Sequence, residues 1–251
     1  NHQITFKAQN KRQAVLNTAG IRTTGDYIKI DGFKLNATNS QPCLESSVGS
    51  DYVSFVNNEC LQPNAGANEP FAIRVLGSHN IVSTNNLYQV QKGFGVSGSY
   101  NLIEENEVDT LYQWEPRGDV DYMRIWGEFQ TVRNNSFRGT PVITGSPHID
   151  CFQNWGIAGW KFSNIVIENN YCEKFAEAVM FNFYNATEIW HDVTVRNNVF
   201  KDGVNGIASN GIQNVKVYNN NFIHLYYSGE GPTTSSNPLS SCTGAEIKNN
   251  I

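Results

Sequence analysis

The sequence predicts an all-β fold, a solenoid in which short parallel strands stack on one another, and three observations predict it. First, an Asn-Asn pair preceded by alternating β-branched residues recurs along the chain, as in Val-Thr-Val-Arg-Asn-Asn at residues 193–198. Second, the second asparagines of these pairs and of two degenerate copies lie 20 to 35 residues apart, a spacing typical of stacked repeats. Third, hardly any segment combines the length of a helix with its hydrophobic period.

Each repeat is expected to form one turn of the solenoid. It holds a short alternating strand, the Asn-Asn corner, a second short strand that begins at an aromatic residue or a cysteine, and a glycine-rich connector. Asparagine suits the corner because it tolerates left-handed backbone angles and because its amide can bond to the same amide in the next strand, about 4.8 Å away. We therefore expect an asparagine ladder in one corner column. Its expected members are Asn58, Asn86, Asn135, Asn170, Asn198 and Asn220.

The residue two places after each pair is expected to face the core and to stack on its counterpart in the next turn. These residues are Phe137, Cys172, Phe200 and Phe222. Of the five cysteines, Cys43 and Cys60 could form a disulfide. Because Cys60 and Cys172 both take the core position, buried free thiols are the favoured interpretation for these two. No CxxC pair is present, which argues against a zinc site.

Composition indicates one elongated domain over residues 1–251. The chain has 39% hydrophobic residues and 33 asparagines, enough for a narrow and continuous core. A net charge of −5 without a Lys/Arg run argues against nucleic acid and anionic membranes as partners, and the apolar stretches are too short to span a membrane. Both ends enter the repeat directly, so we expect a chain trimmed at both ends, with solenoid ends available for self-association.

From residues 27–33 to residues 247–250, the chain resembles the single-stranded right-handed parallel β-helix proteins of the pectate-lyase-like superfamily. That group contains polysaccharide lyases, glycoside hydrolases and uncharacterised secreted proteins. The resemblance rests on the repeat pattern and implies about eight or nine turns, secretion or a place on the cell surface, and a polysaccharide partner. Such a pattern specifies a fold and does not choose a reaction.

Aligning the turns by their corners reveals a column of acidic residues. Asp121 falls opposite Asp150, Glu177 and Asn205, with successive spacings of 29, 27 and 28 residues. Three carboxylates one strand spacing apart repel one another unless a cation, a shared proton or an arginine compensates them. The column is therefore the candidate site.

Two chemistries fit this column. Resemblance to pectate lyases implies that Asp121, Asp150 and Glu177 hold Ca²⁺, which prefers oxygen ligands, and that Arg124 or Lys161 is the base for β-elimination.

Resemblance to β-helix glycosidases instead implies a pair of acids among Asp119, Asp121 and Asp150, with His148 tuning one of them. A structural role of these aspartates in turns, with an arginine pairing to them, is the alternative to both chemistries. In a straight strand Asp150 and Gln153 have opposite parity, so both face one groove only if the chain bends between them.

Aromatic residues in the middle of the chain suggest a sugar-binding groove. Flat rings with polar edges suit the apolar faces of sugars, although the same rings could simply cover the bases of loops. The insertion at residues 154–163 is expected to form a groove wall. The predicted substrate-binding residues are Gln153, Trp126, Trp155, Trp160 and Lys161.

Three functions remain open on the sequence. The first is a secreted carbohydrate-active protein that cleaves or binds a polysaccharide at an acidic groove, by a lyase or a glycosidase reaction. The second is a structural solenoid of an extracellular filament or cell-surface assembly. The third is a non-catalytic glycan-binding module. Polysaccharide turnover separates the first from the other two, and filaments would identify the second.

Overall fold

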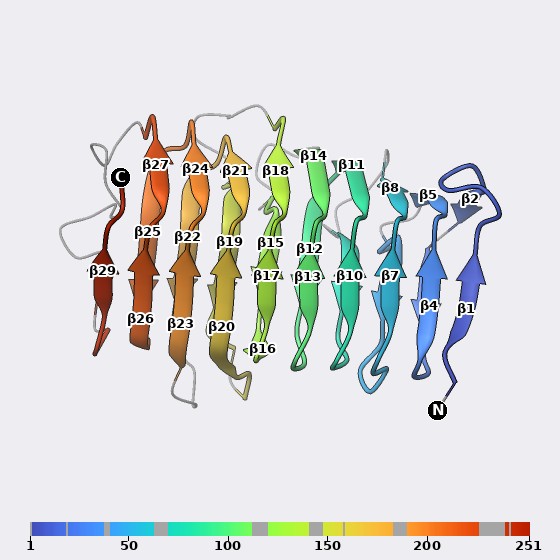
Figure 1. The fold of residues 1–251 in the computed structure, drawn as a ribbon, viewed down its shortest axis with the longest axis horizontal. Coiled ribbons are helices and arrows are strands. Elements are labelled where there is room, and N and C mark those ends of the chain that lie inside the picture. Colours follow the sequence, from blue (N-terminus) through green and yellow to red (C-terminus); the bar gives the residue numbers. More distant parts are fainter. Residues whose placement is uncertain are drawn as a thin grey trace.

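The structure is a computed structural model. It describes residues 2–18, 20–37, 41–62, 70–111, 120–140, 148–157, 159–182, 190–225, 239–240 and 242–251. Within these ranges all the regular secondary structure is β-strand. The strands stack along one long axis, with the two termini at opposite ends (Figure 1). Asp119, one of the predicted acids, lies outside the described residues.

The strands form three sheets, called here sheets A, B and C. Sheet A holds β1 (Ile4–Lys7), β4 (Ile28–Asp31), β7 (Ser54–Val56), β10 (Ile81–Ser83), β13 (Leu102–Glu104), β17 (Thr131–Arg133), β20 (Phe162–Glu168), β23 (His191–Arg196), β26 (Gln213–Tyr218) and β29 (Glu246–Lys248), with β16 (Gly127–Glu128) paired to β20. Sheet B holds β2 (Val15–Thr18), β5 (Lys34–Ala37), β8 (Glu59–Leu61), β11 (Asn86–Val90), β14 (Glu107–Leu111), β18 (Ser136–Arg138), β21 (Tyr171–Glu173), β24 (Val199–Lys201) and β27 (Asn221–Ile223). Sheet C holds β3 (Ile21–Thr23), β6 (Leu44–Ser46), β9 (Phe71–Val75), β12 (Lys92–Val96), β15 (Met123–Ile125), β19 (Asp150–Trp155), β22 (Glu177–Asn182), β25 (Asn205–Asn210) and β28 (Leu239–Ser240).

Each strand pairs in parallel with its counterpart in the next turn, so the chain visits sheets A, B and C in order and then repeats. Sheet C has nine strands, and the described strands therefore make nine such turns before β29. This is the right-handed parallel β-helix that the sequence predicts. The described residues contain no helix long and apolar enough to cross a membrane.

A column of hydrogen-bonded asparagines occupies the corner between sheets A and B. Asn58 Nδ2 donates to Asn85 Oδ1 at 3.1 Å, and the same contact joins each later member to the next at 2.9–3.0 Å. The members are Asn58, Asn85, Asn106, Asn135, Asn170, Asn198, Asn220 and Asn250.

One predicted member of the column, Asn86, was misplaced by one residue. In most turns the first asparagine of the pair takes the left-handed corner conformation, as Asn57 does at φ 60°. In the fourth turn Thr84 takes it instead, at φ 55°. Asn85 therefore fills the column and Asn86 becomes the first residue of β11.

The predicted core positions are confirmed. Phe137, Cys172 and Phe200 are fully buried, and Phe222 is only 3% exposed. They partner one another in register on β18, β21, β24 and β27. The alternation of the sheet B strands therefore sets the inner face of the solenoid as expected.

The prediction of buried free thiols at Cys60 and Cys172 is wrong. Cys43 bonds to Cys60 and Cys151 bonds to Cys172, with Cα–Cα distances of 6.1 and 6.3 Å. Each bridge joins a core cysteine on a sheet B strand to a buried cysteine at the start of the sheet C strand of the preceding turn. The alternation of residues along one strand does not reveal a contact between two sheets. Cys242 forms no disulfide.

Candidate functional site

The acidic column forms at the corner between sheets B and C. Asp150 partners Glu177, and Glu177 partners Asn205, in the registers of β19, β22 and β25. The pairing of β15 with β19 sets Asp121 level with Asp150 in the preceding turn. The structure therefore brings these four residues together in consecutive turns.

Both aspartates of the column are buried. Asp121 and Asp150 are each 0% exposed, and Asp121 Oδ1 accepts a hydrogen bond of 3.1 Å from the Asp150 backbone N–H. Arg124 Nε donates to Asp121 Oδ2 at 2.5 Å. An arginine thus compensates this charge, as the structural interpretation of the sequence anticipated.

Three further nitrogen atoms surround the Asp150 carboxylate. Gln153 Nε2 donates to Asp150 Oδ2 at 2.7 Å, and His148 Nδ1 lies 3.1 Å from the same oxygen. The Glu177 backbone N–H donates to Asp150 Oδ1 at 3.1 Å. Gln153 was predicted to contact substrate, but it is 2% exposed and holds Asp150 instead.

Glu177 titrates near neutral pH. Burial and, secondly, the negative charge of Asp150 raise the pKa of Glu177 to about 7, against the opposing effects of the hydrogen bond from Asn205 and the charge of His148. Asn205 Nδ2 donates to Glu177 Oε1 at 2.9 Å, whereas the buried Oε2 has no hydrogen-bond partner. A half-buried group with this pKa can donate or accept a proton near neutrality.

The column as described does not fit the predicted Ca²⁺. Both oxygens of Asp121 and both oxygens of Asp150 already accept N–H groups, so a cation would have to displace those donors. Among the described residues, no group of three or more His, Cys, Asp and Glu side chains is arranged to hold a metal ion. Calcium at Asp121, Asp150 and Glu177 stays a prediction, and unfolding temperatures with calcium and with a chelator test it.

A groove of about 150 Å³ lies on the outer face of sheet C beside the column, and we call it the sheet C groove. Its lining includes Phe71, Arg74, Gly95, Arg124, Trp126, Trp155 and Trp160. A Cβ on Gly95 would lie 2.7 Å from the Phe71 ring, so the absence of a side chain there lets this ring cover the strand. Three of the five predicted substrate-binding residues are therefore in one groove.

The tryptophans and Arg124 hold one another in place. Trp126 packs edge-on against Trp155 and Trp160, with ring centroids 5.1 and 5.2 Å apart. Trp126 Nε1 donates to the Trp155 carbonyl at 3.1 Å, and the Arg124 guanidinium lies 4.6 Å from the centre of the Trp155 ring. Trp160 is the most exposed of the three, at 36%.

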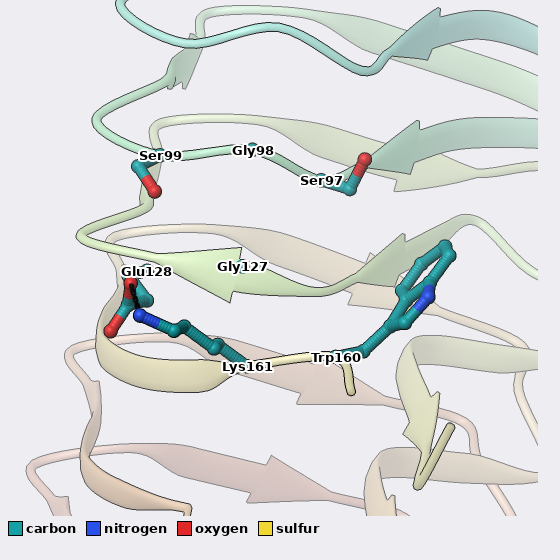
Figure 2. A pocket seen from close by; sticks show the side chains of 7 residues that line it. All are labelled: Ser97, Gly98, Ser99, Gly127, Glu128, Trp160 and Lys161. Atoms are coloured by element: carbon teal, nitrogen blue, oxygen red, sulfur yellow. Dashed lines mark ion pairs between the residues drawn. The ribbon is translucent and has the colours of Figure 1, made fainter. Parts of the chain in front are cut away.

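A second cavity, called here the corner pocket, adjoins the groove and shares Ser97 and Trp160 with it. It has a volume of about 270 Å³, and its other lining residues are Gly98, Ser99, Gly127, Glu128 and Lys161. Figure 2 shows Trp160 and Ser97 toward one end of the pocket, and Ser99, Glu128 and Lys161 toward the other. Lys161 Nζ lies 3.2 Å from Glu128 Oε2, so its predicted role as a base beside the acidic column has no geometric support.

The sequence suggested an acidic groove, but the described part of the groove lining is basic. Among the described residues it contains Arg74 and Arg124 and no carboxylate. The aspartates instead fold back to accept backbone N–H groups at the neighbouring corner. Sequence reasoning missed Phe71, Arg74 and Gly95, although the register that stacks Arg74, Gly95 and Arg124 follows from the same corner alignment.

No protein-family model and no curated protein sequence matches this chain. Several solved structures are similar to it, including the following three. Pectate lyase Pel9A is 15% identical with a TM-score of 0.54, over 99% of this chain and 69% of the lyase. DFA-IIIase from Arthrobacter chlorophenolicus, in complex with GF2, is 11% identical with a TM-score of 0.53, over 94% of this chain and 72% of that enzyme. A tailspike protein of E. coli bacteriophage HK620, in complex with a pentasaccharide, is 12% identical with a TM-score of 0.52, over 99% of this chain and 53% of the tailspike. At these identities the likeness shows the fold alone, the parallel β-helix.

Proposed function

We propose that this protein is carbohydrate-active and binds a polysaccharide chain in the sheet C groove and the corner pocket. The observation that carries the proposal is the gathering of Phe71, Trp155, Trp160 and two arginines around adjoining cavities of about 150 and 270 Å³. Aromatic rings pack on the apolar faces of sugars, while a few polar groups fix the orientation of the ligand. The fold shared with a pectate lyase and with a tailspike in complex with a pentasaccharide supports it.

Within this proposal, Glu177 is the proton donor for cleavage of a glycosidic bond. Its pKa of about 7 leaves it largely protonated at mildly acidic pH. Its proton passes to the leaving glycosidic oxygen as the bond to the anomeric carbon breaks, and water adds to that carbon. In its neutral form, His148, whose side chain is 42% exposed and whose Nδ1 lies 3.1 Å from Asp150 Oδ2, takes the proton of that water. Because the oxygens of Asp121 and Asp150 already accept N–H groups, we favour hydrolysis over calcium-assisted elimination.

Two disulfides support a secreted or cell-surface location. Cys43–Cys60 and Cys151–Cys172 both lie within the core of the solenoid. Such bonds persist in oxidising compartments and are reduced in most cytosols.

Native electrophoresis in gels containing polygalacturonate, alginate, xylan or dextran tests the binding. At least one of these should retard the protein, and Trp160→Ala should weaken binding by about tenfold, as for an exposed aromatic anchor. Tyr88→Ala is the matched control, because Tyr88 is 43% exposed but lies on sheet B. Equal retardation of Trp160→Ala and wild type, or retardation by none of the four, contradicts the proposal.

Incubation with the same four polysaccharides tests the reaction. New reducing ends without the ultraviolet absorbance of unsaturated uronates indicate hydrolysis, and the two together indicate a lyase. Binding without either product identifies a non-catalytic glycan-binding module. Glu177→Gln should abolish hydrolysis while leaving retardation in the gel unchanged.

A further inference from the structure

A column of stacked rings runs along the corner between sheets C and A. Tyr27, Tyr52, His79, Tyr100 and Phe129 contribute one ring from each of five successive turns. Successive centroids lie 4.8, 4.8, 4.9 and 4.5 Å apart, and the ring planes differ by at most 7°. We call these five residues the aromatic column.

The edges of these rings face solvent. Tyr52 is 42% exposed, Tyr100 is 51% exposed and Phe129 is 42% exposed. Because neighbouring rings cover the faces of Tyr52 and Tyr100, what remains accessible on these two is C–H edge and phenolic hydroxyl. The column therefore presents a row of hydroxyl and C–H groups at the strand spacing of the solenoid.

All five residues of the column have a left-handed backbone, with φ between 54° and 59°. Bulky residues adopt this conformation at an energetic cost, whereas asparagine and aspartate tolerate it. In the next three turns the same corner position is held by Asn164, Asp192 and Asn214, at φ 54–58°. Stacking offsets the backbone cost of the rings and is of the same order, so stability alone does not explain why the first turns use rings.

The aromatic column begins where the corner pocket ends. Ser99 and Glu128, which line the pocket, immediately precede Tyr100 and Phe129. Figure 2 shows Ser99 and Glu128 on the same side of the pocket, opposite the Trp160 ring. From there the column continues through three more turns toward the N-terminus.

We propose that the aromatic column is an accessory surface that binds the polysaccharide chain where it leaves the corner pocket. This inference rests on the proposed function. A glycan offers hydroxyl groups and apolar C–H patches in alternation, which matches phenolic hydroxyls and ring edges presented in a row. The added contacts act on long chains, because Tyr27 lies three ring spacings of 4.8–4.9 Å beyond Tyr100, farther than a disaccharide in the pocket extends.

The test uses the triple variant Tyr52→Asn, Tyr100→Asn and Phe129→Asn. Asparagine occupies this corner in later turns, so the variant should fold with an unfolding midpoint equal to or above that of the wild type. Its affinity for whichever of polygalacturonate, alginate, xylan or dextran retards the wild type should fall about tenfold, while calorimetry with the disaccharide of that polymer should show unchanged affinity. Tyr88→Asn on sheet B is the matched control.

The outcomes separate this inference from the proposed function. If the wild type is retarded and the triple variant is retarded equally, the accessory surface is wrong and the groove proposal stands. If none of the polysaccharides retards the wild type, both fall. If the triple variant fails to fold, Tyr52→Phe with Tyr100→Phe keeps the stack and removes two hydroxyls. That double variant should still bind the long chain more weakly than the wild type, and unchanged binding overturns the inference.

Discussion

The Gln153 amide donates a 2.7 Å hydrogen bond to Asp150, three residues before it on β19. Residues three apart on a regular strand lie on opposite faces, so this contact requires a bend. The adjacent residues Cys151 and Phe152 are both fully buried in the core, which a regular alternating strand does not allow, and this indicates the bend. Each buried aspartate of the column is thus covered by the outward side chain three residues later, and Arg124 covers Asp121 in the preceding turn.

Replacing Gln153 by Met should destabilise the fold. The variant keeps the side-chain length but removes a donor to a fully buried carboxylate, which should lower the free energy of unfolding by about 1–3 kcal/mol. Urea denaturation followed by tryptophan fluorescence measures the loss. Met180→Leu, in register with Gln153 on the next strand, is the control and should change stability by less than about 1.5 kcal/mol. Wild-type stability of Gln153→Met would show that the other donors suffice to hold Asp150.

The titration of Glu177 should make stability depend on pH. Its pKa is about 7 in the fold against an ordinary 4.5, so the native state binds this proton more tightly than the unfolded chain does. The contribution is therefore fully present below the ordinary pKa and is lost as pH rises through about 7. Urea midpoints measured across this range should fall for the wild type and stay flatter for Glu177→Gln.

A second variant checks the cause of this shift. The hydrogen bond from Asn205 favours the ionised form of Glu177 and so opposes the rise in its pKa. Asn205→Ala should therefore extend the fall in stability to higher pH. The assigned protonation of Glu177 is contradicted if the pH range over which stability falls is the same in Asn205→Ala as in the wild type. It is also contradicted if the urea midpoints of the wild type do not depend on pH.

Periodicity predicted the architecture because each rung repeats the same constraint. The alternation that buries Phe200 and the corner that needs a left-handed residue return in every turn, so one rule predicts many positions. The same rule misplaced Asn86, because Thr84 can also adopt the left-handed corner and then shifts the register of the pair by one. A sequence motif does not detect a position where another residue type, here Thr84, adopts the same backbone conformation.

Contacts between sheets were harder to predict than contacts along a sheet. The corner alignment placed Asp150 level with Glu177 correctly, since both lie in one sheet. The bridge from Cys151 to Cys172 depends on how the strands of sheets C and B are placed relative to each other. The alternation of residues along either strand does not predict that placement. The groove likewise depends on Phe71 leaning over Gly95, and a glycine gives no signal in a pattern of charges.

The Cys151–Cys172 disulfide should contribute substantially to stability. It closes a loop of 21 residues within the core, and cross-links of this kind typically contribute about 2–4 kcal/mol. The double variant Cys151→Ala with Cys172→Ala should lower the unfolding midpoint accordingly, in the absence of reductant. Cys242→Ala, which removes the cysteine that forms no disulfide, is the control and should leave the midpoint nearly unchanged. Equal midpoints for the double variant and the wild type contradict the bridge.

Two adjacent asparagines should differ strongly in how much stability their substitution costs. Asn135 is 2% exposed, donates to the Ile103 carbonyl at 3.0 Å and accepts from the Asn106 backbone N–H at 3.0 Å. Asn135→Ala leaves both buried groups without these partners and should cost about 3 kcal/mol or more.

The neighbouring Asn134 is exposed and contributes its backbone conformation, at φ 55°. Asn134→Gly should therefore change the free energy of unfolding by less than about 0.5 kcal/mol, because glycine adopts this conformation freely. Asn134→Val should cost about 1–2 kcal/mol, because a β-branched residue resists it. Urea denaturation of the three variants side by side measures the contrast. Similar losses of stability for Asn135→Ala and Asn134→Gly would contradict the assignment of a hydrogen-bonding role to Asn135 and a backbone role to Asn134.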